Sequence, residues 1–281
     1  MPMETDTPAL RDLERMAATI RCDIIRMIHR AGAGHPGGAL SAADLVTALY
    51  FRVMRLDPRN PSWPARDRFI LSKGHACPVL YAALARRGYF PLSELDTLRQ
   101  LGSRLQGHPD MLKTPGIDMT AGSLGQGLSA GLGMALAARV KGLDIHVYVL
   151  VGDGEVQEGQ VWEAAMAGSK WQTANLVALL DCNRLQNDGE VAGIMPVEPL
   201  AAKWQAFGWE VREIDGHNMR QIVETLEEVR DHAVRPTAIL AHTIKGCGVS
   251  FMENVPGWHG RAPNDEEAER ALCELRRRLN G

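Results

Sequence analysis

The amino-acid sequence predicts an α/β fold in which a parallel central sheet is covered by helices on both faces. In the second half of the chain, short β-branched apolar segments alternate with helical segments, which is the pattern of parallel βαβ units. The segments 145–151 and 175–181 are apolar almost throughout, as expected for strands of a sheet buried on both faces. No change in composition marks a linker, so we expect a single domain over residues 1–281.

The first half of the chain is expected to be mainly helical. Apolar residues spaced near 3.6 predict a helix over 8–30, which glycines at 32 and 34 end. Ser41, three residues before Asp44, is typical of a helix cap and predicts that a second helix starts there. A strand is expected over 68–72, and Ser93 with Asp96 indicates the start of a third helix.

The second half of the chain alternates more regularly. A helix of small residues is expected to run from the glycine-rich segment 122–127 to residue 138. Further strands are expected over 145–151, 175–181, 209–214 and 237–243. Further helices are expected over 159–170, 219–232 and 265–280. The last of these is charged and amphipathic, so we expect its charges to form a solvated face.

Composition argues against several classes of protein. Lys and Arg number 31 against 34 Asp and Glu, and the net charge of -3 disfavours nucleic acid as a partner. No apolar run reaches the ~18 residues of a membrane span. Residues 1–6 lack the apolar segment of a secretory signal. The five cysteines are odd in number and form no C-x-x-C pair, so we expect no disulfide framework and a reducing, cytoplasmic location.

Polar side chains follow two successive predicted strands. Residues 152–155 read Gly-Asp-Gly-Glu, and residues 181–183 read Asp-Cys-Asn. Ligands of open α/β sheets lie past the carboxyl ends of strands. Carboxylate and amide oxygens suit Mg²⁺ or Ca²⁺ beside a substrate phosphate. Each segment alone is also typical of an ordinary turn, but the two together predict a metal–diphosphate site.

A glycine-rich segment lies upstream of these strands. Residues 122–127 read Gly-Ser-Leu-Gly-Gln-Gly and lead into a predicted helix, whose N-terminus would be a generic anion site. The spacing differs from the G-x-G-x-x-G fingerprint and no strand clearly precedes it, so it indicates a Rossmann site only weakly. Close packing of the helix through its glycines is an alternative that can hold at the same time.

Four of the nine histidines lie in glycine- or proline-rich loops: His35, His75, His108 and His259. No pair has the spacing of a zinc site, so we expect these side chains to hydrogen-bond a polar substrate or to transfer protons. The other five histidines are expected to be structural. Lys245 follows the last predicted strand, where it supplies a cation to a diphosphate or is an ordinary loop lysine.

Three glutamates follow the predicted metal strand. Glu155 comes directly after the Gly-Asp-Gly turn, and Glu158 and Glu163 come next. Glu158 and Glu163 are five residues apart and do not stack on one helical face. From the residues alone, both are expected to be exposed helix charges.

The motifs, taken in order, resemble the amino-terminal, diphosphate-binding half of the transketolases. The resemblance covers nearly the whole chain, to about Pro263, and implies the thiamine diphosphate-binding fold (PP domain). G-D-G followed after 27 residues by Cys182-Asn183 is similar to the thiamine diphosphate signature, with Cys182 in place of the usual first asparagine. The motifs are G-H-P-G, S-K-G-H, G-H-P, G-S-L-G-Q-G, G-D-G-E-x-x-E-G-x-x-W-E-A, D-x-N and T-x-K-G-x-G followed by W-H-G.

The resemblance implies a cofactor, thiamine diphosphate, and a metal that holds it. Asp153, Asn183 and the backbone carbonyl of Leu185 match metal ligands, for Mg²⁺ with Ca²⁺ or Mn²⁺ as substitutes. The positions that match the cofactor-binding residues are Gly122, Ser123, Leu124, Gly154, Glu155 and Lys245, together with His75, Asp153, Asn183, Leu185 and His259.

The resemblance also implies catalytic roles. His75 matches a histidine beside the cofactor diphosphate and the reaction centre. His35, His108 and His259 match histidines that face the sugar, orient its hydroxyls and help to move protons. Two further residues match a buried glutamate cluster that links paired active sites, against the exposed positions expected from spacing alone; they are Glu158 and Glu163.

A complete transketolase chain is more than twice as long as this one and adds a pyrimidine-binding domain and a carboxy-terminal domain. Nothing after Pro263 matches either of them. We therefore expect the first subunit of a split transketolase, whose partner in an α₂β₂ assembly is a C-terminal transketolase subunit. The expected reaction moves a two-carbon ketol unit from a ketose, or its phosphate, to an aldehyde acceptor at a site between the chains.

Other functions share part of this pattern. The α subunit of a 2-oxo acid dehydrogenase has a split thiamine diphosphate site but lacks the four-histidine set, and deoxyxylulose-phosphate synthase is normally one longer chain. A binding-only subunit would not need Asp153, Asn183 and His75 intact. A specialised pathway with an unusual sugar stays open, because most contacts to the sugar phosphate lie on the missing chain.

Overall fold

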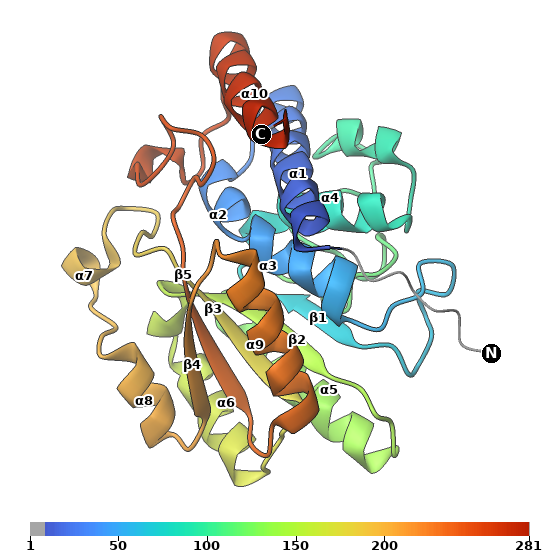
Figure 1. Ribbon diagram of the computed structural model, residues 1–281, viewed down its shortest axis with the longest axis vertical. Helices are drawn as coiled ribbons and strands as arrows, with labels where there is room; N and C mark the ends of the chain where they lie inside the picture. The colour runs from blue at the N-terminus through green and yellow to red at the C-terminus, as the bar shows by residue number, and fades with distance from the viewer. Residues whose placement is uncertain (1–8, 281) are drawn as a thin grey trace.

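Five parallel strands form the central sheet of this computed structural model, which describes residues 9–280 apart from the side chains of residues 278 and 280 (Figure 1). The order across the sheet is β1-β2-β3-β5-β4, and every neighbouring pair is parallel. The parallel sheet predicted from the sequence is thereby confirmed. The strands are β1 (Arg68–Leu71), β2 (Val147–Gly152), β3 (Leu176–Cys182), β4 (Glu210–Asp215) and β5 (Thr237–His242).

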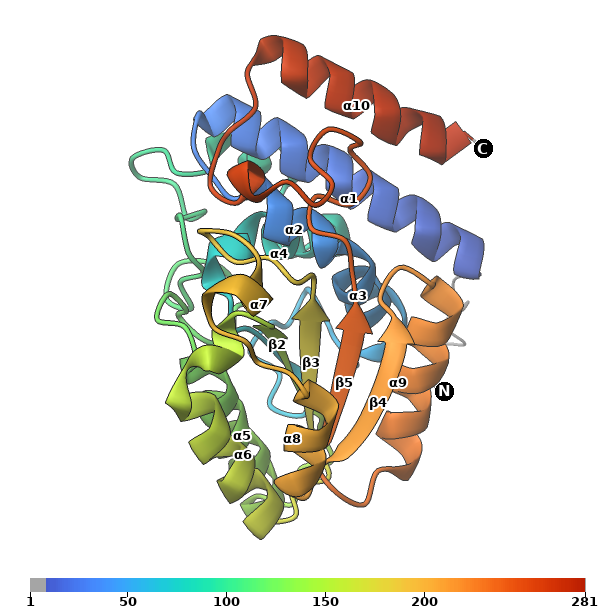
Figure 2. The same cartoon turned by 90° about the vertical axis from the view of Figure 1, so that its left-hand side faces the viewer.

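Helices cover both faces of this sheet and its carboxyl end. Figure 2 shows α5 and α6 on one side of the sheet, α9 on the other, and α1 and α10 above the ends of the strands. The helices are α1 (Leu10–Ala31), α2 (Pro36–Ser41), α3 (Ala43–Ala48), α4 (Cys77–Arg87), α5 (Gln126–Val140), α6 (Gly159–Lys170), α7 (Val191–Ile194), α8 (Leu200–Ala206), α9 (Met219–His232) and α10 (Asp265–Asn280). Within residues 9–280, none of them is long and apolar enough to cross a membrane.

Alternate residues of the strands enter two separate hydrophobic cores. Tyr148 and Leu150 of β2 pack in the core that includes residues of α1, α3, α4 and α9. Val147, Val149 and Val151 of the same strand pack in the core that includes residues of α5, α6 and α8. Because a strand turns successive side chains to opposite faces, two cores require strands that are apolar at every position. This explains the unbroken apolar segments of the sequence.

Elements with a strong amphipathic or apolar pattern lie where they were predicted. The bounds of α6, α9 and α10 agree with the expected 159–170, 219–232 and 265–280, and each strand agrees to within about two residues. In α10, Ala268, Ala271 and Leu275 are buried, whereas most of its charged residues lie toward solvent. The helix expected over 8–30 is α1, although residue 8, like the segment 1–6, lies outside the described residues.

The prediction of a helix start at Ser41 is wrong. Helix α2 begins at Pro36 and ends at Ser41, and α3 follows from Ala43. The hydroxyl of Ser41 caps no helix but donates a hydrogen bond to Asp181 at 2.6 Å, and Asp44 is buried in an ion pair with Arg21. Both side chains meet the local pattern of a cap, but partners distant in the sequence bind them instead.

Two further differences concern the region after β1. The helix expected at Ser93 is a short 3-10 helix, Leu92–Thr97. Helix α4 was not predicted, because Cys77 to Ala85 are all buried and show no periodicity. Its ends do carry the usual signals, since Pro78 lies in the first turn and Gly88 ends the helix in the left-handed conformation at φ 90°.

Candidate functional site

The polar residues predicted at the strand ends meet at the carboxyl edge of the sheet. A cavity of about 800 Å³ opens there, and Asp153, Asn183 and Leu185 contribute to its lining. This is the edge at which parallel α/β sheets bind ligands. The loops after all five strands supply polar residues: Lys73 and His75 after β1, Asp153 after β2, Asn183 after β3, His217 after β4 and Lys245 after β5.

Asp153 is a buried carboxylate directly after β2. Its Oδ1 accepts a hydrogen bond from the backbone N–H of Gly154 at 2.8 Å, and its Oδ2 accepts one from the N–H of Arg184 at 2.5 Å. Burial, followed by the negative charge of nearby Asp181, raises its pKa to about 6. Among residues 9–280 no ion pair of Asp153 is found. A cation placed beside this carboxylate would therefore be strongly favoured.

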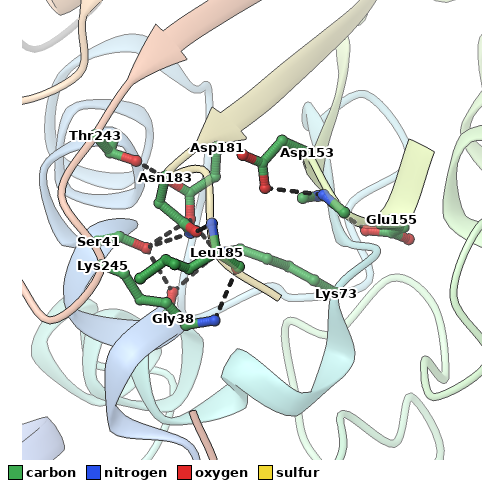
Figure 3. Close-up of polar contacts among 12 residues, drawn as sticks. Gly38, Ser41, Lys73, Asp153, Glu155, Asp181, Asn183, Leu185, Thr243 and Lys245 are labelled. Carbon is green, nitrogen blue, oxygen red and sulfur yellow. Dashed lines mark hydrogen bonds and ion pairs between the residues drawn. The ribbon is translucent and has the colours of Figure 1, made fainter. Parts of the chain in front are cut away.

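The amide of Asn183 is held at both ends (Figure 3). Its Nδ2 donates to Oδ2 of Asp181 at 3.1 Å, and its Oδ1 accepts from the N–H of Leu185 at 3.1 Å. The carbonyl of Leu185 in turn accepts a hydrogen bond from Nζ of Lys245 at 2.8 Å. The three residues that match metal ligands thus present a carboxylate, an amide oxygen and a backbone carbonyl, all hard oxygen donors.

Lys245 is the positive counterpart of Asp153. Its side chain is buried, and Nζ contacts the carbonyl of Leu185 and Nδ1 of His259, each at 2.8 Å. Burial, and then the charge of nearby Lys73, lowers its pKa to about 8. No carboxylate forms an ion pair with it in the described part of the chain. The ammonium is thus placed to meet an anion.

These charges fit a metal–diphosphate group. A divalent metal would compensate the carboxylate of Asp153, and a diphosphate would compensate the ammonium of Lys245. Cys182 lines the same cavity, and burial, followed by the charge of Asp153, raises the pKa of its thiol well above the usual value. The three oxygen donors suit Mg²⁺ or a similar hard ion.

Three of the four predicted loop histidines form a cluster. The ring centroids of His35, His75 and His259 lie 5.0–5.5 Å from one another. Burial, with Lys73 next, lowers the pKa of His75 to about 2, and burial, with Lys245 next, lowers that of His259 to about 3. Nδ1 of His35 is buried and has no hydrogen-bond partner within residues 9–280. The three rings are therefore neutral, and their nitrogens can form hydrogen bonds with a polar ligand.

His108 has no ring contact with this cluster among the described residues, although it contributes, after burial, to lowering the pKa of His35, and it lies against the glycine-rich segment. It is exposed, and a Cβ added at Gly122 would lie 3.9 Å from its ring. Burial, with Arg99 next, lowers its pKa. Gly122, Ser123 and Leu124 are also exposed, so they are accessible to a ligand or to a partner chain.

Helix α5 begins within this segment, at Gln126, and packs closely on the end of β1. A Cβ at Gly127 would lie 2.4 Å from Oγ of Ser72. The glycines thus also serve close packing, as the alternative interpretation of the sequence held.

The carboxylate of Glu155 is buried and accepts hydrogen bonds from groups of the protein itself. Its Oε1 accepts from the N–H of Gly125 at 2.9 Å and from the hydroxyl of Ser72, and its Oε2 accepts from the N–H of Gly152 at 3.0 Å. Burial raises its pKa despite these hydrogen bonds. The side chain joins the ends of β1 and β2 to the glycine-rich segment, so its contribution to cofactor binding would be made through that segment.

Glu158 and Glu163 are exposed in this single chain, one at the N-terminal end of α6 and the other within it. That is the position expected from their spacing alone. Their burial in a glutamate cluster requires another chain, and it stays a prediction.

Two site residues were not singled out in the sequence, Lys73 and Asp181. Both side chains are buried, at 3% and 0% exposure, and they form an ion pair beside Asn183 (Figure 3). Each belongs to a motif that the sequence does show, S-K-G-H and D-C-N. Their pairing could not be read there, because 108 residues separate them.

A second group of metal-ligand residue types lies beside the cavity. Ligand atoms of Asp44, His217 and Cys247 lie within 4.8 Å of one another. Arg21, however, donates hydrogen bonds to both oxygens of Asp44, at 2.9 and 2.6 Å. The guanidinium thus already supplies the positive charge, and we assign no metal to this group.

His217 links this group to the loop of Lys245. Its Nδ1 lies 2.7 Å from Oδ2 of Asp44, and its Nε2 accepts from the N–H of Ile244 at 2.8 Å. Burial opposes the charged ring, but the contact with Asp44 raises the pKa above its usual value. The N–H of Ile244 limits this rise in pKa, because Nε2 cannot accept its hydrogen bond once Nε2 is protonated. The structural role expected for His217 is thus the positioning of a loop.

Comparison with known proteins gives one family model that matches most of the chain. The model is described as "Transketolase, thiamine diphosphate binding domain", and it matches residues 13–276. The chain is also similar to two curated proteins of its own length. One is the 6-deoxy-6-sulfo-D-fructose transketolase subunit SqwG of Clostridium sp. (strain MSTE9), 49% identical over 94% of this chain and 96% of the relative. The other is an apulose-4-phosphate transketolase subunit of Phocaeicola vulgatus, 42% identical over 95% of each chain.

Solved structures agree with these relatives. The crystal structure of transketolase from Campylobacter jejuni superimposes with a TM-score of 0.88 at 32% identity and covers 94% of this chain. The match covers 42% of that transketolase, so this chain corresponds to less than half of the longer enzyme.

Proposed function

Because this chain belongs to the transketolase family, as its thiamine diphosphate-binding domain, we propose that it is the amino-terminal subunit of a two-chain transketolase. The proposal rests on the length of this chain compared with the lengths of its relatives. Relatives named as transketolase subunits align with the chain over 95–96% of their own length, whereas it spans 42% of a full transketolase. The remaining domains would then be supplied by a second chain.

The cofactor would be held between Asp153 and Lys245. Asp153, Asn183 and the carbonyl of Leu185 would bind Mg²⁺, or Ca²⁺ or Mn²⁺ in its place, and Lys245 with the backbone of residues 122–124 would bind the diphosphate. When bound, thiamine diphosphate supplies the nucleophile and electron sink for cleavage of the ketose C2–C3 bond. The buried charges of Asp153 and Lys245 support this assignment.

The clustered histidines would bind the sugar and move its protons. His35, His75 and His259 are neutral near pH 7, so each ring carries one donor and one acceptor nitrogen. Because Nδ1 of His259 accepts from Nζ of Lys245, His259 offers a substrate hydroxyl its Nε2–H donor. The unpartnered Nδ1 of His35 is one nitrogen ready for such a hydroxyl. A neutral ring can also take the proton of a hydroxyl as a carbonyl forms. His108, which is exposed beside Gly122, would meet the far end of the sugar.

The donor is proposed to be a ketose that carries a terminal anionic group. The names of two relatives specify 6-deoxy-6-sulfo-D-fructose and apulose 4-phosphate, and both are ketoses with such a group. At 49% identity, the relative named for the sulfonated sugar makes 6-deoxy-6-sulfo-D-fructose the first donor to test. Transfer of carbons 1 and 2 from it would leave a four-carbon aldehyde that keeps the sulfonate.

The partner chain would complete the site, and two copies of each chain would form an α₂β₂ assembly. The exposure of Glu158 and Glu163 in the single chain agrees with their burial in such an interface. We place the enzyme in the cytoplasm, since all five cysteines are free and suit a reducing compartment.

A coupled ketol-transfer assay tests the proposal. The chain is purified with the chain encoded beside its gene and is supplied with thiamine diphosphate and Mg²⁺. 6-Deoxy-6-sulfo-D-fructose and xylulose 5-phosphate are compared as donors, with an aldose phosphate as acceptor. Each chain is also assayed alone, and Asp153→Ala serves as the inactive control.

We expect turnover only in the mixture. Turnover by this chain alone would overturn the two-chain proposal. Decarboxylation of a 2-oxo acid without ketol transfer would instead identify a dehydrogenase α subunit. Cofactor binding without turnover on any donor would favour a binding-only subunit.

A further inference from the structure

The carboxylate of Asp181 is a fully buried junction beneath the proposed metal site. It accepts a hydrogen bond from the hydroxyl of Ser41 at 2.6 Å and from Nδ2 of Asn183 at 3.1 Å. It also accepts from Nζ of Lys73 and from the hydroxyl of Thr243. Figure 3 shows these side chains converging on it from separate segments. A carboxylate with four donors has a fixed position and orientation.

Lys73 is the only cation that pairs with Asp181 among residues 9–280. Its side chain is 3% exposed, and Nζ also donates to the carbonyl of Gly38 at 2.9 Å. These two contacts place the ammonium of Lys73 between the carboxylate and the backbone of α2, so Lys73 fixes the position of Asp181 relative to that helix.

The contact with Asp181 fixes which way the amide of Asn183 turns. Oδ2 of Asp181 accepts a hydrogen bond from the NH₂ end of the amide at 3.1 Å. The oxygen end then lies away from Asp181, where the N–H of Leu185 contacts it at 3.1 Å. Only the oxygen of an amide binds a hard metal ion.

We propose that Asp181 and Lys73 are positioning residues for the metal site, in which Asp181 directs the oxygen of Asn183 to the metal and Lys73 holds Asp181 in place. The inference rests on the proposed function, which assigns Asn183 as a metal ligand. It gives a structural role to Lys73 of the S-K-G-H motif and to Asp181, the first residue of D-C-N. Residues one step removed from a metal ligand typically change metal affinity about 10- to 100-fold when they are altered.

Two variants with opposite changes of charge test the proposal. Asp181→Asn removes a negative charge near the metal, and Lys73→Met removes a positive charge. If these residues acted through charge alone, the first variant would bind a cation more weakly and the second more tightly. If they position Asn183, both bind it more weakly. Lys73→Arg, which keeps the charge, should lose less affinity than Lys73→Met.

The readout is binding of Mn²⁺, followed by electron paramagnetic resonance of free Mn²⁺, with thiamine diphosphate present and the partner chain bound. We expect the half-saturating Mn²⁺ concentration to rise about 10-fold or more in Asp181→Asn and in Lys73→Met. Thr243→Val removes one donor to Asp181 at nearly unchanged volume and should give a smaller rise in the same direction. This milder variant keeps the test decisive if a charge variant does not fold.

Arg66→Met is the matched control. It breaks the buried ion pair of Arg66 with Asp118, at 2.5 Å, near the amino end of β1 and away from the cavity. It should lower the melting temperature without changing the half-saturating Mn²⁺ concentration.

Tighter Mn²⁺ binding in Lys73→Met, or unchanged binding in both charge variants, would overturn the inference and leave the proposed function standing. Failure of the unaltered protein to bind Mn²⁺ and thiamine diphosphate would overturn the proposed function itself, and this inference with it.

Discussion

Nδ1 of His217 lies 2.7 Å from Oδ2 of Asp44, and this contact joins the loop after β4 to α3. Arg21 of α1 holds the same carboxylate, and the other ring nitrogen of His217 accepts the N–H of Ile244. A continuous series of polar contacts thus runs from α1 to the residue before Lys245. The stability of the fold and the position of a proposed cofactor ligand are linked through it.

Asp44→Asn should destabilise the chain strongly. It leaves the guanidinium of Arg21 buried beside a neutral amide, and breaking a buried pair in this way typically costs about 3–5 kcal/mol. Although burial alone would raise the pKa of Asp44, Arg21 lowers it to about 2. The stabilisation is therefore present above the unfolded-state pKa of about 3.9 and is lost as the pH falls toward 2.

Urea unfolding of the wild-type chain and of Asp44→Asn at pH 7 and pH 3 measures this dependence. The difference between their unfolding free energies should be smaller at pH 3. Equal differences at the two pH values would show that the ion pair contributes nothing that titrates.

Asp153→Asn should separate stability from cofactor binding. Without ligands, its melting temperature should equal or exceed that of the wild type, because a buried carboxylate without a cation is removed. Saturating thiamine diphosphate with Mg²⁺ should stabilise the wild type, by about 2.7 kcal/mol at 100 times the dissociation constant, and leave the variant unchanged. Calorimetric melts measure both, with exposed Asp188→Asn as a control that keeps the ligand-induced rise. A full rise in Asp153→Asn would exclude Asp153 as a ligand of the metal.

The clustered histidines should stay neutral through the physiological range. Burial, with Lys73 next, lowers the pKa of His75 to about 2, and burial, with Lys245 next, lowers that of His259 to about 3. Their rings should gain a proton, and lose their role as acceptors, only far below pH 6. NMR titration of labelled ring Cε1–H groups checks this, and Lys73→Met should move the midpoint of His75 upward. A midpoint of His75 near 6.5 in the folded wild type would contradict the prediction.

Glu155→Gln should weaken both the fold and the cofactor site. The new NH₂ group must face a backbone N–H of Gly125 or Gly152, or the hydroxyl of Ser72. A buried donor left without an acceptor costs about 1–3 kcal/mol. Urea unfolding measures that loss, and titration with thiamine diphosphate measures the effect on the glycine-rich segment. The exposed Glu266→Gln should change neither quantity, and equal behaviour of the two variants would remove the role given to Glu155.

The parts of the fold that the sequence predicted have a strong pattern of their own. Helices α6, α9 and α10 each show a one-sided arrangement of apolar residues, and the buried strands are continuously apolar. Helix α4 has neither pattern, because its residues from Cys77 to Ala85 are buried on all sides. Ser41 and Asp44 satisfied a local rule but bind partners 140 and 23 residues away. Such partners are not visible in a local pattern.

The site likewise contains residues that could be predicted from the sequence and residues that could not. Asp153 and Asn183 could be placed together because both follow strands of a parallel sheet, whose carboxyl ends share one edge. The pairing of Lys73 with Asp181 joins residues 108 positions apart and depends on the order of the strands. That order could not be obtained from periodicity. The neutral state of the histidines likewise depends on burial and on nearby lysines, which only the assembled fold brings together.

The order of the strands also determines how much of the chain must be translated before the sheet can be completed. Strand β4 emerges from the ribosome before β5, yet among the described strands its neighbour in the sheet is β5, which lies between it and β3. β4 therefore has no strand to pair with until residues 237–242 have been made, and Lys245 follows directly. A nascent chain that ends earlier leaves the edge of β3 open to unwanted pairing. The chain must therefore be translated at least as far as Lys245 before the proposed cofactor can be captured.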